Sequence, residues 1–354
     1  MKLRVPQYFK EFHCISDKCK DNCCIGWEID IDDETANIYN KVSGEFGEKL
    51  QKNITATTPK SFILDKHDRC PFLNNKNLCE IFINLGEKNL CQICTEHPRY
   101  YEWFNNIKEG GIGLCCEEAS RIILSQNTEF ITYDINIPFE SADEYDSNLY
   151  VYLQCSRNKI ISHLDNTSLS LNSRIRNVLM YAHKLQENID NNDLSDIDIT
   201  FVQTNKKTNL QPILEFFLTL EPFDINWITY LKNNISLYNN SINKLEEFEN
   251  TNSQISNYLQ NISIYFVWRY FLKGVFDLDI LSKIKLMAVS IAVIKFLFFC
   301  KWLENATLTF NDCVKIAKDY SKEIEYSDDN LSALVDAYYE LDSFSVENLI
   351  GLFS

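Results

Sequence analysis

Apolar residues recur every three to four positions through most of the chain after residue 140. This repeat is typical of amphipathic helices that bury one face. The polar residues 190–209 interrupt it and predict a loop, and Pro212 follows at a first-turn position where proline is tolerated. The predicted helices cover residues 141–164, 168–189, 211–220, 227–237, 255–276, 277–304, 311–325 and 328–341.

The first third of the chain lacks such a sustained repeat. Asp32 precedes a helical pattern and can cap its first turn, and Gly86 can end a short helix over residues 78–85. A further helix is predicted over residues 117–124, and an extended stretch over 130–135. This part of the chain is therefore expected to be mostly irregular.

Hydropathy also bears on the cellular compartment. The most apolar stretch, residues 286–300, contains Lys295 and follows Lys283 and Lys285, so it is too short and too charged to span a bilayer and predicts a buried helix. Residues 1–7 have no apolar segment of the kind found in signal peptides. We therefore expect a cytoplasmic protein with no membrane partner.

Composition and charge narrow the class of partner. With 45% hydrophobic and 24% charged residues, the chain has the make-up of a folded globular protein. Its 34 Lys and Arg against 50 Asp and Glu give a net charge of −16. Non-specific binding to nucleic acid needs a basic surface, so a nucleic-acid partner is not expected.

The cysteines are distributed very unevenly. Of thirteen, only Cys155, Cys300 and Cys313 lie in the last two-thirds of the chain, where burial as small apolar residues explains them. The other ten are Cys14, Cys19, Cys23, Cys24, Cys70, Cys79, Cys91, Cys94, Cys115 and Cys116.

Three explanations compete for these ten thiols. Disulfides need an oxidising compartment, and the adjacent pairs Cys23-Cys24 and Cys115-Cys116 make poor local bridges. Packing alone does not explain so many thiols in about a hundred residues. The spacing Cys91-x2-Cys94, with the run of cysteines before residue 25, favours metal or iron–sulfur ligation, and thiolates suit zinc and iron equally.

These patterns together predict a mainly α protein. An irregular, cysteine-rich, metal-binding N-terminal domain, residues 1–128, is expected to precede an all-helical domain, residues 129–354. The glycines at 110–113 bring the chain to Cys115 and Cys116, which begin the helix over 117–124. The free amides at the start of that helix would favour thiolates there.

The order of these motifs resembles a known family. Cys23-Cys24-Ile25-Gly26-Trp27, Cys70-Pro71-Phe72-Leu73 and Cys91-x2-Cys94-x2-His97-Pro98-Arg99 resemble the CxxCxxxxCC family of zinc- or iron-chelating bacterial proteins. Cys115-Cys116-Glu117-Glu118 before a helix, and residues 265–273, look like the flagellin lysine-N-methylases within that family.

The resemblance implies a methyltransferase that uses S-adenosylmethionine to methylate lysine side chains of flagellin and carries a [4Fe–4S] cluster. His97 stands where the family more often has phenylalanine, and Cys115-Cys116-Glu117 stands where it more often has Cys-Pro-Glu. His97 and Cys115 are therefore additional candidate ligands. The metal ligands that the resemblance implies are Cys14, Cys19, Cys23, Cys24, Cys70, Cys79, Cys91, Cys94 and Cys116.

Residues near these cysteines are candidates for the chemistry of methyl transfer. Aromatic faces stabilise sulfonium and methylammonium groups, carboxylates can orient a lysine or accept its proton, and arginine can bind the carboxylate of the donor. Each type also has an ordinary structural role, in packing, at a helix start or in a local ion pair. The catalytic candidates are Tyr100, Tyr101, Glu117 and Glu118, and the donor-binding candidates are Trp27, Arg99 and Trp103.

Two other functions stay open at this point. The cysteine-rich part could be an iron–sulfur module for electron transfer, or a zinc-stabilised domain in a structural or adaptor protein without methyltransferase activity. Redox cycling would support the former. Tightly bound zinc in a colourless protein would support the latter.

Overall fold

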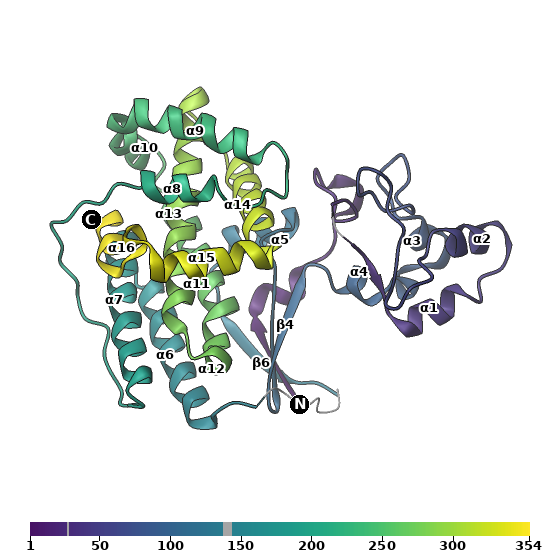
Figure 1. Ribbon diagram of the computed structural model, residues 1–354, viewed down its shortest axis with the longest axis horizontal. Coiled ribbons are helices and arrows are strands. Elements are labelled where there is room, and N and C mark those ends of the chain that lie inside the picture. Colours follow the sequence, from purple (N-terminus) through teal and green to yellow (C-terminus); the bar gives the residue numbers. More distant parts are fainter. Residues whose placement is uncertain (27, 137–143) are drawn as a thin grey trace.

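The computed structural model describes residues 1–26, 28–136 and 144–354. It has a large helical body and a smaller lobe that carries α1 to α4, and strands β4 and β6 lie between the two in the view of Figure 1. Most residues of the body are helical, which confirms the prediction of a mainly α protein.

The helices of the body follow the predicted periodicity closely. The helix predicted over 255–276 ends earlier in the structure, because Phe271–Lys273 forms a 3-10 turn (η5) before α12. Two short helices, α10 and α16, were not predicted. The helices are α5 (Glu117–Ser125), α6 (Ser147–Asp165), α7 (Leu171–Asp190), α8 (Gln211–Phe217), α9 (Trp227–Ser241), α10 (Leu245–Thr251), α11 (Ile255–Tyr270), α12 (Gly274–Asp277), α13 (Ile280–Asn305), α14 (Phe310–Glu325), α15 (Asp328–Glu340) and α16 (Val346–Leu352). The part of the first predicted helix at 141–143 lies outside the described residues.

Helix α13 forms the centre of the body. The helix extends beyond the apolar stretch 286–300 at both ends. By length and composition it is apolar enough to cross a membrane, which corrects the expectation that it is too short and too charged to do so. However, 83% of its most apolar window is buried inside the protein, and α7, α11 and α14 pack against it. The prediction of a buried helix is therefore confirmed, since neighbouring helices cover most of α13.

A four-stranded sheet was not predicted. Its strands are β1 (Lys2–Pro6), β4 (Arg99–Phe104), β5 (Ile107–Ile112) and β6 (Phe130–Asp134), in the order β4-β5-β1-β6. Strand β1 runs parallel to β5 and antiparallel to β6, and β4 and β5 form a hairpin. Only β6 matches an expected extended stretch, because the pairing of β1 with β5 joins residues about a hundred positions apart.

The glycines at 110 and 111 lie in a strand, not in a turn that only delivers the chain to the cysteines. A Cβ atom at Gly111 would lie 2.3 Å from the hydroxyl of Tyr100, its partner across the hairpin. The Gly110 carbonyl accepts a hydrogen bond of 3.0 Å from the indole of Trp268 on α11. The glycines thus let a helix and a large cross-strand side chain approach the backbone of β5.

The smaller lobe has short helices, α1 (Asp33–Tyr39), α2 (Gly44–Lys52), α3 (Glu80–Leu85) and α4 (Gln92–Glu96), and a two-stranded sheet of β2 (Asp30–Ile31) and β3 (Lys60–Ser61). Asp32 caps α1 by accepting the Thr35 amide at 2.9 Å, as predicted. Gly86 ends α3 with a φ of +85°, also as predicted. Local sequence therefore determines the ends of these two helices.

Apolar side chains form two separate cores. One lies within the lobe and includes Tyr39, Phe62 and Phe72. The other is the core of the body, and it takes in residues 3–12 and 104–124 together with the C-terminal helices. The beginning of the chain and the β4–β5 hairpin therefore pack with the helical body, and the boundary at residue 128 stays a prediction.

Charged contacts join the lobe to α14 and α5. The Asp21 carboxylate lies 2.7 Å from Lys318 and 3.1 Å from Lys322, both on α14. Burial acts to raise the pKa of Asp21, but the two ammonium groups outweigh it and hold the pKa below its usual range. The Lys20 amide donates to Glu117 at 2.7 Å. These contacts place the first cysteines of the chain beside the start of α5.

Candidate functional site

Cysteines of the smaller lobe gather around the starts of two helices. Cys79 precedes α3 and Cys91 precedes α4, with the sulfur atoms of Cys91 and Cys94 3.3 Å apart. Burial is the main cause that raises the pKa of Cys70 to about 12, and the charges of Cys79 and Cys91 raise it further. Charges act on one another in this way only at short range. These thiols therefore occupy one region of the lobe.

The adjacent pair near the start of the chain belongs to the same region. The Cys70 amide donates to the Cys24 carbonyl at 2.9 Å, which fixes the two backbones side by side. A hydrogen bond with Cys23, together with burial, holds the pKa of Cys24 well above its usual value, and the charges of Cys70 and Cys79 add to this. We call Cys23, Cys24, Cys70, Cys79, Cys91 and Cys94 the lobe cysteines.

A second set of thiols lies where the lobe meets the body. Cys116 is the N-cap residue of α5, and the charges of Cys115 and Cys19 both contribute to its raised pKa, after burial as the main cause. The Cys19 thiol lies 3.6 Å from a carboxylate oxygen of Glu117. Cys115 is hydrogen-bonded to the Tyr326 hydroxyl, and burial raises the pKa of its thiol to about 11. We call Cys19, Cys115 and Cys116 the junction cysteines.

The donor set suits a thiophilic metal, although the arrangement is not closed around one. Within the described ranges, no three His, Cys, Asp or Glu side chains are grouped so that they could hold a metal ion. Five of the lobe cysteines are nevertheless partly or fully buried and Cys23 is exposed, and all six lie in one region and are the soft ligand type that zinc and iron–sulfur clusters prefer. Cys14 is exposed, and its sulfur accepts the Ser16 amide at 3.4 Å.

A buried polar network lies next to the junction cysteines. The Glu325 carboxylate, at the end of α14, accepts hydrogen bonds of 2.8 Å from the hydroxyls of Tyr265 and Tyr270 and one of 2.6 Å from Ser321. The Arg269 guanidinium lies 3.2 Å from the same carboxylate, whose side chain has no exposed area. Four donors therefore surround one buried carboxylate, which satisfies its hydrogen-bonding capacity.

The network also holds the turn that carries the junction cysteines. The Tyr265 hydroxyl accepts hydrogen bonds from Arg269 at 2.6 Å and from the Leu114 amide at 3.3 Å. Burial holds the pKa of Tyr265 and of Tyr270 well above the usual value, so both phenols remain donors. We call Tyr265, Arg269, Tyr270 and Glu325 the core network.

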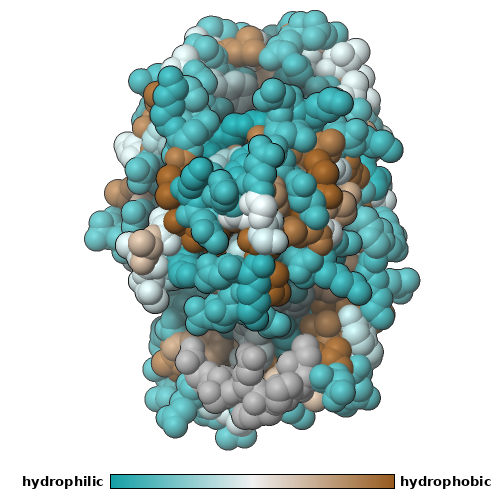
Figure 2. Space-filling model, turned by 90° about the vertical axis from the view of Figure 1, so that its right-hand side faces the viewer, coloured by the Kyte–Doolittle hydropathy of each residue, from teal (hydrophilic) through white to brown (hydrophobic). Residues whose placement is uncertain are grey.

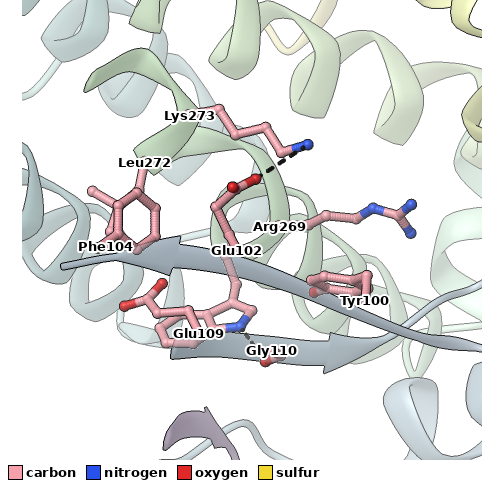
Figure 3. A pocket seen from close by; sticks show the side chains of 9 residues that line it. Tyr100, Glu102, Phe104, Glu109, Gly110, Arg269, Leu272 and Lys273 are labelled. Carbon is pink, nitrogen blue, oxygen red and sulfur yellow. Dashed lines mark hydrogen bonds and ion pairs between the residues drawn. The ribbon is translucent and has the colours of Figure 1, made fainter. Parts of the chain in front are cut away.

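Tyr100 is the one catalytic candidate that meets the core network. The guanidinium of Arg269 lies 4.6 Å from the Tyr100 ring centre and 5.3 Å from that of Tyr270. Figure 3 shows Tyr100 on its strand below Arg269. The protein's own arginine thus occupies the kind of aromatic and acidic surroundings that bind cations.

Alternation along β4 places the neighbouring candidates on the other face of the strand. Tyr101 donates to Glu96 at 2.8 Å, and Lys108 lies over the rings of Tyr101 and Trp103 at 3.8 and 4.6 Å. Arg99 lies over the rings of Phe9 and Phe12 at 5.6 and 5.2 Å. The structure therefore separates Tyr101, Trp103 and Arg99 from Tyr100.

The acidic candidates have local partners. Glu117 accepts the Lys20 amide at 2.7 Å, and Glu118 is paired with Arg121 at 2.5 Å on the same helix. His97 lies against the ring of Tyr326, with 6.4 Å between ring centres, and burial lowers its pKa to about 4. Trp27 lies outside the described residues.

Two pockets flank η5. The first, drawn in Figure 3, lies between the β4–β5 hairpin and residues 268–273, and at about 10 Å³ it holds no more than one water. The second is about 180 Å³ and lies between residues 270–286 and α15. Lys273 lines both, and Tyr270 connects the second pocket to the core network.

Sequence reasoning missed the core network as a site, although it singled out residues 265–273. The available signal was Arg269, a charge within the otherwise apolar and aromatic second half of α11. Glu325 gave no signal, because it is one of several acids in an amphipathic helix. Only the packing of α11 against α14 and the β4–β5 hairpin shows that Arg269 and Glu325 lie next to each other.

One buried acid near the junction predicts a pH effect on stability. Glu323 is 3% exposed and accepts the amides of Phe223 at 2.8 Å and Asp224 at 2.9 Å. Burial raises the pKa of Glu323 from 4.5 to about 7, and the charges of Asp224 and Asp319 act in the same direction. The Phe223 ring packs against Tyr326, so this contact lies beside the junction cysteines.

Because the folded pKa of Glu323 is the higher one, its contribution to stability is complete below pH 4.5 and is lost as the pH rises through 7. Relative to the unchanged chain, Glu323→Gln should therefore gain up to about 1.4 kcal/mol per pH unit over that window. Urea unfolding of both proteins across the window tests this. Parallel pH profiles for the two proteins would show that burial does not perturb Glu323.

Comparison with known proteins shows the family to which the chain belongs. A model of the FliB lysine N-methylase C-terminal domain matches residues 157–352, more than half of the 354 residues. The lysine-N-methylases of Salmonella typhimurium and Salmonella choleraesuis are each 22% identical over 238 residues, which cover 61% of this chain and 56% of theirs. The flagellar biosynthetic protein FliU of Salmonella muenchen is 26% identical over 133 residues, 34% of this chain and 75% of that protein.

These matches cover only part of this chain and part of the relatives. The chain spans about half the length of the lysine-N-methylases that it matches. No solved structure matches it. The matched residues 157–352 contain α11, α14 and α15, and with them the core network and the larger pocket. The chain belongs to the family defined by the FliB lysine N-methylase C-terminal domain.

Proposed function

We propose that the protein is a cytoplasmic lysine N-methyltransferase that transfers a methyl group from S-adenosylmethionine to lysine side chains of flagellin. The observation that carries this proposal is the family match over residues 157–352. The names of the relatives, a lysine-N-methylase and a flagellar biosynthetic protein, support the lysine acceptor and the flagellar substrate.

In the proposed reaction, the lone pair of a neutral lysine ε-amine attacks the methyl carbon of the donor. The bond between that carbon and the sulfonium sulfur breaks, S-adenosylhomocysteine leaves as a neutral thioether, and the methylated amine sheds its extra proton to solvent. The protein must hold donor and amine in line and keep water away from them. The buried phenols and carboxylate of the core network give it a rigid scaffold for this.

We also propose that the cysteines hold a [4Fe–4S] cluster. Four thiolates suffice for one, and the lobe cysteines supply six thiols in one region. When bound, such a cluster supplies redox-active iron and a strong constraint on the fold around it. The junction cysteines lie next to the core network, so the turn that carries them connects the cysteine-rich part of the chain to this network.

Metal content tests this proposal. After anaerobic purification, we expect broad absorption near about 400 nm and about four irons and four sulfides per chain. Cys91→Ala and Cys94→Ala should each lose most of the iron, since they remove adjacent lobe thiols. Cys155→Ala is the matched control and should keep the iron, because this thiol on α6 is exposed, and not buried as its position in the chain had suggested.

Methylation is measured separately. Mass spectrometry of flagellin incubated with the protein and S-adenosylmethionine should show additions of one or more methyl groups on lysine. Iron without methylation would leave the chain as an iron–sulfur module. A colourless protein with one or two zinc ions and no methylation would contradict both parts of the proposal.

The zinc-stabilised alternative keeps one observation in its favour. The lobe has its own core, around Tyr39, Phe62 and Phe72, and this core is much smaller than that of the body. Small cores often depend on a metal for their stability. Zinc content with intact methylation would assign the lobe cysteines a purely structural role.

A further inference from the structure

The larger pocket combines an apolar wall with a charged rim. Its aliphatic side chains come from α13 and α15, and two tyrosines, Tyr270 and Tyr338, complete the wall. At about 180 Å³ it is far larger than the roughly 10–15 Å³ that one water needs. The aliphatic residues are Leu286, Leu331, Leu334 and Val335.

The rim carries both signs of charge. Lys273 is 45% exposed and only loosely paired, 3.7 Å from Glu102. Figure 3 draws this ion pair as a dashed line. Lys283 is paired with Asp277, and the Asp277 carboxylate is 48% exposed. Ser282 adds a hydroxyl to the lining, 3.4 Å from the Lys283 ammonium. The pocket thus offers an apolar surface next to a cation, an anion and a hydroxyl.

We propose that this pocket binds the S-adenosyl methyl donor, an inference that rests on the proposed function. The donor has an apolar, flat base, a ribose diol, a sulfonium and an amino-acid end with a carboxylate. The aliphatic wall suits the base, Asp277 can accept from the ribose hydroxyls, and Lys273 can bind the donor carboxylate. The pocket holds the adenosyl part, and the amino-acid end lies at the open rim.

Tyr270 places the sulfonium of the donor. The Tyr270 ring lines the pocket, while its hydroxyl donates to Glu325 at 2.8 Å and so cannot rotate away freely. An aromatic ring attracts a sulfonium as it does other cations. The reactive methyl group would therefore lie on the side of the pocket that faces the core network.

The rim favours the donor over the target lysine as the occupant. A lysine side chain would match the aliphatic wall, but it carries no anion for Lys273 to bind. The donor carries its cation beside an aromatic ring and its anion at the rim, so its charges are complementary to those of the pocket.

Binding of S-adenosylmethionine and S-adenosylhomocysteine to the full chain, measured by calorimetry, tests the site. Val335→Trp places a large ring in the pocket from a partly exposed position on α15 and should weaken binding of both ligands at least tenfold. Ser332→Trp, on the exposed face of the same helix, is the matched control and should bind like the unchanged chain. Circular dichroism confirms that both variants are folded.

A second variant tests the orientation of the donor. Lys273→Met should weaken S-adenosylhomocysteine about tenfold or more while leaving adenosine, which has no carboxylate, within twofold. An equal loss of affinity for S-adenosylhomocysteine and adenosine would overturn the assignment of Lys273. Unchanged binding in Val335→Trp, with flagellin still methylated, would overturn the pocket and leave the proposed function intact. If the unchanged chain binds neither ligand, the proposed function fails and this inference fails with it.

Discussion

Replacing Arg157 with methionine should lower the free energy of unfolding by about 3–5 kcal/mol. Arg157 is on α6, has no exposed area, and forms two hydrogen bonds of 2.7 Å to the carboxylate of Glu109 on β5. Its guanidinium also lies 4.1 Å from the ring centre of Trp268. Without it, Glu109 keeps, among the described residues, only the longer ion-pair contact of 3.5 Å with Arg4, so a buried charge loses its main partner.

Urea unfolding of the full chain measures this effect. The matched control is Arg121→Met, which removes another arginine–glutamate pair, but one whose arginine is 49% exposed. That change should cost no more than about 1 kcal/mol, as surface pairs usually do. Similar losses for both variants would show that burial does not strengthen the Arg157–Glu109 contact.

Glu325→Gln should be almost as destabilising, by about 3 kcal/mol or more, because Arg269 then loses the only carboxylate that pairs with it among the described residues. The amide of glutamine must also accommodate three hydroxyl donors and a guanidinium that were arranged around a carboxylate. Unfolding by urea measures the loss. Glu304→Gln, which breaks the exposed pair with Lys301, should change stability by no more than about 1 kcal/mol.

The same variant should loosen the turn that carries the junction cysteines. The Tyr265 hydroxyl accepts the Leu114 amide while it donates to Glu325 and accepts from Arg269, so we expect the loss of Glu325 to weaken its hold on Leu114. Hydrogen exchange at residues 113–116 should therefore become faster in Glu325→Gln, and equally so in Tyr265→Phe, which removes the acceptor itself. Unchanged exchange in Tyr265→Phe would show that the core network does not hold this turn.

The two buried ion pairs, Arg157–Glu109 and Arg269–Glu325, both involve α11. Trp268 and Arg269 are neighbours on this helix, yet the first packs on the ion pair of β5 and α6 and the second pairs with α14. Residues 265–273 thus act as the point where sheet, helices and cysteine turn meet. These residues lie within the span 157–352 that the family model matches.

The helical architecture was readable from the sequence alone. A repeat of three to four residues depends only on which side of a helix is buried, so the positions of α6 to α9, α11 and α13 to α15 follow from local pattern. The caps at Asp32 and Gly86 depend on one or two neighbouring residues and were equally predictable. The uneven cysteine distribution also marked out the region where thiols gather.

The sheet and the candidate site were decided by tertiary structure. Strand β1 pairs with β5 across about a hundred residues, and no local pattern specifies such a partner. The core network draws side chains from α11 and α14 and bonds to the turn at Leu114, each with an ordinary local setting. Alternation along β4 then placed Tyr100 with this network and Tyr101 away from it. Periodicity reports burial of a face, but only the packing of distant elements determines which polar groups share the same buried space.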